Sequence, residues 1–212
     1  MATERPRIPL RRRLLYLYFH GHYWLEGLRY DLGMWKRAVS PHAVKRRAVR
    51  QYAKEYGART LVETGTYMGD MLAAMARSFD ELHSIELSDL YYGKAQARFA
   101  GKPHVHLHKG DSAEELQKIV AGLRGRALFW LDAHYSGGAT ARAALETPIV
   151  HELREIFRAN DPRHVILVDD ARCFDGTCDY PTMDEVRELV RSLAPGYSVD
   201  VREDIIRITP PR

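Results

Sequence analysis

From residue 60 onward the sequence alternates short apolar runs with segments of helical periodicity, and this alternation limits the folds open to the chain. The runs ALFWL (127–131) and VILV (165–168) are apolar at every position, as expected of strands that helices cover on both faces. The pattern predicts an α/β fold with a doubly wound, mainly parallel sheet that ends in a hairpin around Glu203-Asp204. The predicted strands lie at 60–63, 82–86, 105–108, 127–131, 165–168, 197–201 and 205–208.

The predicted helices begin at recognisable N-terminal signals. Two segments, Ser112–Glu115 and Thr182–Glu185, have the capping-box pattern, in which a hydroxyl and a carboxylate three residues apart satisfy backbone N–H groups. We therefore expect Ser112 and Thr182 to cap the helices that follow them. The helical segments run over 71–78, 88–99, 112–123, 147–158 and 182–193.

Residues 1–59 differ from the rest of the chain in charge. They hold 14 Lys and Arg against 4 Asp and Glu, whereas residues 60–212 hold 18 against 24. A second helical stretch in this leader follows Ser40-Pro41 and ends at Gly57. The first stretch carries an apolar stripe of Leu14, Tyr18, Gly21, Leu25, Leu28, Leu32 and Trp35. We therefore divide the chain into a basic helical extension, 1–59, and a main domain, 60–212.

The apolar stripe of the leader needs something to cover it. We expect its helices to lie as a lid over the carboxyl ends of the strands, with a homodimer formed through them as an extension of that role. The alternative is a peripheral contact with an anionic membrane through Arg11, Arg12 and Arg13. Nucleic acid is the weaker candidate, because the leader carries no recognisable RNA-binding motif.

Three features predict a cytoplasmic location. The sequence has no run of about 18 apolar residues of the kind that spans a membrane. The apolar run after Arg13 is shorter than a signal peptide requires, and no small-residue cleavage site follows it. Cys173 and Cys178 are the only cysteines, so no disulfide framework is expected.

The first predicted strand ends in a glycine-containing turn, Glu63-Thr64-Gly65-Thr66-Tyr67-Met68-Gly69-Asp70. Glycines allow a ligand to approach the backbone closely. The dinucleotide pattern G-x-G-x-x-G does not occur here, and Asp70 at the helix start would repel a pyrophosphate. The turn therefore favours a cationic adenosyl ligand without phosphate, and a nicotinamide-dependent (NAD) oxidoreductase is the alternative.

Glu86 ends the second predicted strand, 21 residues after Gly65, where an acidic residue can accept hydrogen bonds from a ribose diol. The alternative for Glu86 is a solvated carboxylate at a strand end. The third strand leads into Gly110-Asp111-Ser112, where an adenine edge can be held. We expect the cofactor to be bound by Glu63, Thr64, Gly65, Gly69, Glu86, Asp111 and Ser112.

Three carboxylates follow the fourth and fifth strands, namely Asp132 and the pair Asp169-Asp170. At neighbouring strand ends they would repel one another unless they were protonated or bridged by a cation, and oxygen ligands suit Mg²⁺ or Ca²⁺. The alternative is that Asp170 caps a turn or pairs with Arg172, while only Asp132 faces the cleft. His134 is the first candidate for a general base, and its alternative role is to orient Asp132.

These segments resemble a class I S-adenosylmethionine-dependent methyltransferase over Thr60–Pro210. LVETGTYMGD is similar to the family's first motif, SIEL to its ribose-binding acid, GDS to its adenine-contacting segment and YSVDVREDIIRITP to its antiparallel last strand. WLDAH with LVDDA resembles the metal-binding aspartates of catechol O-methyltransferase and, more closely, of macrocin-type sugar O-methyltransferases. The resemblance implies a seven-stranded Rossmann-like sheet, S-adenosylmethionine (SAM) as cofactor, and Mg²⁺ held by Asp132, Asp169 and Asp170.

The resemblance also implies methyl transfer to a hydroxyl. We expect a small molecule, sugar or glycan as the acceptor, with Asp132 and His134 as catalytic residues, because His134 follows the candidate ligand Asp132 by two positions in a loop that faces the donor. The metal would favour ionisation of the acceptor hydroxyl, His134 would take the proton, and the oxygen would attack the methyl group in line with the sulfur. The expected acceptor is a vicinal diol, a sugar first and a catechol second. The loop HYSGGATARAALETP departs from better-known members, so the acceptor itself is not carried over. A non-catalytic RNA-binding or partner-binding protein is the remaining alternative.

Overall fold

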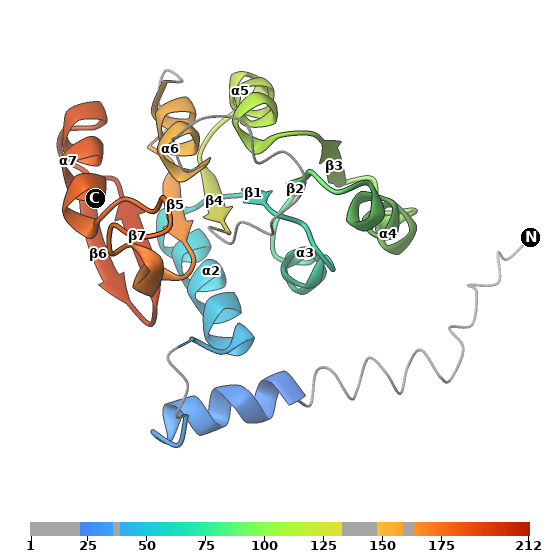
Figure 1. The fold of residues 1–212 in the computed structure, drawn as a ribbon. Coiled ribbons are helices and arrows are strands. Elements are labelled where there is room, and N and C mark those ends of the chain that lie inside the picture. The colour runs from blue at the N-terminus through green and yellow to red at the C-terminus, as the bar shows by residue number, and fades with distance from the viewer. Residues whose placement is uncertain (1–21, 36–38, 133–147, 159–162) are drawn as a thin grey trace, which may run out of the picture. The chain divides into compact units, whose positions relative to one another are not determined.

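The computed structural model describes residues 22–35, 39–132, 148–158 and 163–212 (Figure 1). The chain divides into two compact units, Met1–Lys45 and Arg46–Arg212. In the first unit residues 22–31 are helical, and Leu25, Leu28 and Leu32 of the predicted stripe are exposed. The first three members of that stripe lie outside the described residues.

The second unit contains a seven-stranded sheet with the order β3-β2-β1-β4-β5-β7-β6. Strands β1 to β5 pair in parallel, and β7 lies antiparallel to both of its neighbours, β5 and β6. The predicted mainly parallel sheet with an antiparallel last strand is therefore confirmed. The strands are β1 (Thr60–Thr64), β2 (Glu81–Glu86), β3 (Val105–Lys109), β4 (Ala127–Leu131), β5 (Val165–Val168), β6 (Ser198–Arg202) and β7 (Ile205–Thr209).

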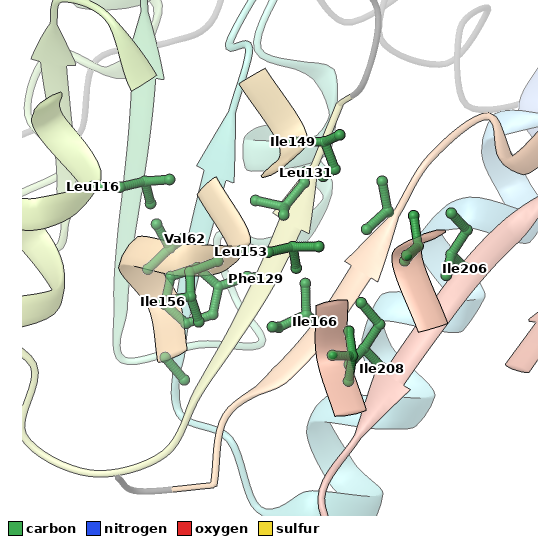
Figure 2. Packing of buried hydrophobic residues seen from close by; sticks show 14 of the residues in the cluster. Val62, Leu116, Phe129, Leu131, Ile149, Leu153, Ile156, Ile166, Ile206 and Ile208 are labelled. Atoms are coloured by element: carbon green, nitrogen blue, oxygen red, sulfur yellow. The ribbon is translucent and has the colours of Figure 1, made fainter. Parts of the chain in front are cut away.

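Helices cover both faces of this sheet (Figure 1). Phe129 and Leu131 of β4 belong to a core cluster with α5, α6 and α7, whereas Leu128 and Trp130 belong to a second cluster with α2, α3 and α4. Figure 2 shows the first cluster, with side chains of α6 beside those of β4 and β5. The helices are α2 (His42–Tyr56), α3 (Asp70–Met75), α4 (Asp89–Phe99), α5 (Ser112–Gly122), α6 (Pro148–Arg158) and α7 (Met183–Leu193). The described helices are too short or too polar to span a membrane.

Helix α2 is part of the core of the sheet-containing unit. Its side chains Val49 and Tyr52 lie in the same cluster as Leu128 and Leu167 of the sheet. The expected boundary after residue 59 therefore moves to Lys45–Arg46, because the apolar face of α2 covers the sheet. Only the residues before this boundary form a unit of their own.

The two predicted capping boxes have different outcomes. At α7, the Glu185 amide donates to Oγ1 of Thr182 at 3.2 Å and the Thr182 amide donates to Oε2 of Glu185 at 2.7 Å, so this box is confirmed. At α5 the prediction is wrong, because Asp111 is the N-cap and its Oδ1 accepts from the Ala113 amide at 2.9 Å. Ser112 is the first helical residue. Asp and Ser are about equally good N-caps, so the sequence pattern alone could not choose between neighbours.

Candidate active site

The carboxyl ends of the parallel strands meet along one edge of the sheet (Figure 1). At this edge the Asp132 amide donates to the Thr64 carbonyl at 3.3 Å, and the Asp169 amide donates to the Leu131 carbonyl at 2.9 Å. The backbone therefore joins the glycine turn after β1 to the carboxylates that follow β4 and β5. In sheets of this kind, ligands bind at this edge.

The turn between β1 and α3 requires glycine at two positions. Gly65 and Gly69 have φ angles of 84° and 71°, in the left-handed region that favours glycine. A Cβ on Gly65 would lie 3.3 Å from Cβ of Asp132, and a Cβ on Gly69 would lie 2.7 Å from Cε2 of Phe99. The turn thus lies close against the end of β4 on one side and against α4 on the other.

Glu86 is a buried acceptor at the end of β2, only 8% exposed. Its Oε2 accepts from the Tyr67 amide at 2.7 Å, and its Oε1 accepts from the Ser88 amide at 2.8 Å. Tyr67 has a φ of 46°, which is uncommon for a residue other than glycine. The structure therefore excludes the alternative of a freely solvated carboxylate, because backbone amides fix both oxygens of Glu86.

Glu63 is buried at the end of β1. Its Oε2 accepts from Oγ of Ser84 at 2.7 Å, and Oγ of Ser84 lies 2.6 Å from Oγ1 of Thr66. Burial raises the pKa of Glu63 to about 8; the Ser84 hydrogen bond opposes this rise, and the charges of Asp132 and Glu86 reinforce it. Burial thus favours the protonated form of Glu63, whereas a cationic ligand beside it would favour the ionised form.

Glu152 of α6 is a candidate that the sequence analysis missed. It is 3% exposed and lies on the buried, otherwise apolar stripe of its helix. Burial raises the pKa of Glu152 to about 7, while the neighbouring hydroxyls of Ser112 and Thr64 lower it. Both partners are predicted cofactor-binding residues, so Glu152 links two parts of that site. A carboxylate on an apolar helical stripe was the signal in the sequence, because such a group is rarely buried without a partner.

Asp132, Asp169 and Asp170 each place a carboxylate oxygen within 4.8 Å of the others. Among the described residues, these three form the one cluster of at least three His, Cys, Asp or Glu side chains that could hold a metal ion. Asp169 and Asp170 are buried, whereas Asp132 is partly exposed. The donor set consists of oxygens alone, which fits a hard divalent cation such as Mg²⁺.

Asp170 also forms the ion pair that was the alternative prediction. Nη1 of Arg172 lies 2.6 Å from Oδ1 of Asp170 and also contacts Oδ2 of Asp204. Burial would lower the pKa of Arg172, but these two carboxylates outweigh that effect and raise it. Asp170 therefore belongs both to this ion pair and to the group of three carboxylates. The predicted base, His134, lies outside the described residues.

No protein-family model matches this chain, and no curated protein sequence matches it either. Solved structures do match. An O-methyltransferase from Bacillus cereus, in complex with SAH, is 16% identical with a TM-score of 0.57, and the match covers 89% of this chain and 90% of that one. The O-methyltransferase TomG from Streptomyces achromogenes, of tomaymycin synthesis and in complex with SAM, is 18% identical with a TM-score of 0.55, over 86% of each chain.

A third match extends the likeness beyond these enzymes. Magnesium protoporphyrin IX methyltransferase from Synechocystis, with bound SAM, is 13% identical with a TM-score of 0.51, over 80% of each chain. These identities are low, so what the matches share with this chain is the arrangement of strands and helices. The strand order, the antiparallel β7 and these matches together show that the chain has the fold of the class I SAM-dependent methyltransferases.

Proposed function

We propose that this chain is a SAM-dependent and Mg²⁺-dependent O-methyltransferase that acts on a hydroxyl of a small molecule, sugar or glycan. One observation carries the proposal. The carboxylates of Asp132, Asp169 and Asp170 converge beside the turn in which Gly65 approaches Asp132. A donor bound on this turn and a hydroxyl held at the carboxylates would therefore be neighbours.

The donor side of the site is formed by the ends of the first three strands. Glu86 is the proposed acceptor for the ribose hydroxyls, and Gly65 and Gly69 leave room for the ligand along the backbone. Asp111 and Ser112, at the start of α5, are proposed to hold the adenine edge. Glu63 and Thr64 complete the proposed donor set beneath the turn.

On the acceptor side, Asp132, Asp169 and Asp170 are the residues that would hold Mg²⁺. A divalent cation supplies positive charge that favours ionisation of an acceptor hydroxyl. In the proposed reaction His134 removes the hydroxyl proton, and the acceptor oxygen then attacks the methyl group in line with the sulfur of the donor. A cation held at these carboxylates could bind two adjacent hydroxyls of the acceptor. We therefore propose a vicinal diol as the acceptor, with a sugar preferred to a catechol.

A methylation assay on sugar and catechol diols tests the proposal. Turnover should disappear with excess EDTA and return with added Mg²⁺, and full turnover in EDTA would remove the metal from the proposal.

Calorimetry with SAH and with NAD, each with and without Mg²⁺, separates a methyltransferase from an oxidoreductase. Binding of NAD alone would favour the oxidoreductase. Affinity for RNA with a steep salt dependence, without binding of SAH, would favour the non-catalytic alternative.

For residues 1–45 we propose the role of a cover for the acceptor site, with a homodimer as its extension. Leu25 and Leu28 are exposed on the helical residues 22–31, and the exposed Leu32 follows them directly; exposed apolar side chains gathered in this way mark a contact surface. Sedimentation of the full chain with anionic vesicles, compared with its mass in solution, tests this role against peripheral membrane contact. Co-sedimentation of a monomer would support the membrane.

A further inference from the structure

The turn of the β6–β7 hairpin reaches the loop that carries the candidate metal ligands. Glu203 and Asp204 form this turn, with φ angles of 55° and 57°. The Ala171 amide donates to the Asp204 carbonyl at 3.0 Å, and the Arg172 amide donates to Oδ1 of Asp204 at 2.9 Å. Asp204 therefore holds the backbone of the two residues that follow Asp170.

The Arg172 side chain adds a second link between the hairpin and the ligand loop. Its Nη1 donates to Oδ1 of Asp170 at 2.6 Å and to Oδ2 of Asp204. The side chains of Asp170 and Asp204 are 3% and 9% exposed, so solvent screens these contacts weakly. One guanidinium thus fixes a buried carboxylate of the candidate metal site to a residue of the hairpin turn.

Asp170 needs such a restraint because its backbone is unusual. It has a φ of 57° and a ψ of 46°, a left-handed conformation that a residue other than glycine adopts at a cost in energy. Its amide donates to Oδ1 of the neighbouring Asp169 at 2.9 Å. A strained conformation of this kind persists where surrounding contacts hold it, and Asp204 contacts the two residues that follow Asp170.

We propose that Arg172 and Asp204 are positioning residues that orient Asp170 toward a divalent cation; this inference rests on the proposed function. Asp204 also has an electrostatic effect, because its charge compensates a guanidinium that would otherwise repel a cation bound nearby. Removal of Asp204 therefore loosens the loop and leaves Arg172 uncompensated. Both consequences weaken cation binding.

The test measures Mn²⁺ binding to the full chain by electron paramagnetic resonance of the free ion, without donor or acceptor. Asp204→Asn removes the charge and keeps the size, whereas Arg172→Lys keeps the charge on a side chain one bond shorter than the arginine whose Nη1 meets both carboxylates. Each variant should bind Mn²⁺ about 10- to 100-fold more weakly, as is typical when a residue that orients a metal ligand is replaced. SAH affinity, measured by calorimetry, should not change.

Asp200→Asn is the matched control, because Asp200 lies in the same hairpin and pairs with the exposed Arg202. It changes the net charge as Asp204→Asn does and should leave Mn²⁺ affinity unchanged. Wild-type affinity in both test variants would overturn the inference and leave the proposed function standing. Equal weakening in Asp200→Asn would also overturn it, because net charge alone would then explain the effect. Absence of Mn²⁺ binding to the wild type would remove the metal from the proposed function and the inference together.

Discussion

The backbone amide of Tyr67 lies 2.7 Å from Oε2 of Glu86, and this hydrogen bond ties the turn after β1 to the end of β2. The contact fixes the carboxylate of Glu86 and the left-handed backbone of Tyr67 at the same time. Glu86 therefore has two roles, as the proposed ribose acceptor and as a restraint on the glycine turn.

Glu86→Ala should weaken SAH binding by about tenfold or more, because charge-assisted hydrogen bonds worth about 1.5–3 kcal/mol are lost. Isothermal titration calorimetry measures this change. Glu81→Ala is the control, since Glu81 begins the same strand and lies exposed at its opposite end. Equal affinities of Glu86→Ala and Glu81→Ala, in folded variants, would place the ribose elsewhere.

Gly69→Ala should destabilise the fold by about 1–3 kcal/mol, because the added Cβ would meet Phe99 and the left-handed φ disfavours alanine. Gly93→Ala is the matched control within α4, where a Cβ meets nothing within 4 Å. This control should stabilise the chain by about 0.5–1 kcal/mol, since alanine is the better helix residue. Urea unfolding of both variants measures the difference. A Gly69→Ala variant as stable as the wild type would show that the turn adapts.

The sheet could be predicted from the sequence because its central strands are apolar on both faces. ALFWL and VILV became β4 and β5 with the predicted bounds, and their terminal aspartates lie together as parallel pairing requires. Helix α2 was assigned to a separate extension because its basic residues mask the apolar face that Val49 and Tyr52 present to the sheet. Glu152 was missed because a single carboxylate does not disturb the helical periodicity of its segment.

The Asp204 contact could not be predicted at all. The residues of the hairpin follow the ligand loop by about thirty positions, and pairing of β7 with β5 alone decides that they meet. Local patterns such as capping and alternation act within a few residues, so they carry no information on this long-range contact.

Glu63→Gln should change how stability depends on pH. The pKa of Glu63 rises from its ordinary value of 4.5 to about 8 in the folded chain, mainly through burial. Between these values the folded chain holds a proton that the unfolded chain has released, so this group lowers the free energy of unfolding as pH rises. Glutamine stays neutral, so the variant should gain stability relative to the wild type from pH 4.5 to about pH 8 and level off above.

Urea unfolding of both chains over this pH range measures the effect, because other titrating groups contribute equally to the two curves. Glu55→Gln serves as the control, since this carboxylate lies on the exposed side of α2 and pairs with Arg212. Parallel curves for the wild type and Glu63→Gln would contradict the prediction.

Glu152→Leu should lower the free energy of unfolding by about 1–3 kcal/mol and weaken SAH binding, because leucine cannot interact with the neighbouring hydroxyl of Ser112 as the carboxyl group does. Glu152→Gln keeps an accepting oxygen and should retain SAH affinity. Glu155→Leu is the control on the same helix, where Glu155 pairs with the exposed Arg158. If Glu152→Leu behaved like Glu155→Leu, Glu152 would have no part in the cofactor site.

Helix α2 contributes the first residues of the folded core along the described chain. A chain that starts at Arg59 lacks α2, so the sheet face that Val49 and Tyr52 cover would be exposed to water. Each such side chain contributes about 1.5–3 kcal/mol when buried, which is a large share of the stability of a domain. This chain should therefore unfold without cooperativity and fail to bind SAH.

A chain that starts at Val39 keeps Ser40-Pro41 and the whole of α2, and should unfold cooperatively and bind SAH as the full chain does. Circular dichroism melts and calorimetry compare the two. Normal SAH binding by the chain that starts at Arg59 would return α2 to the extension.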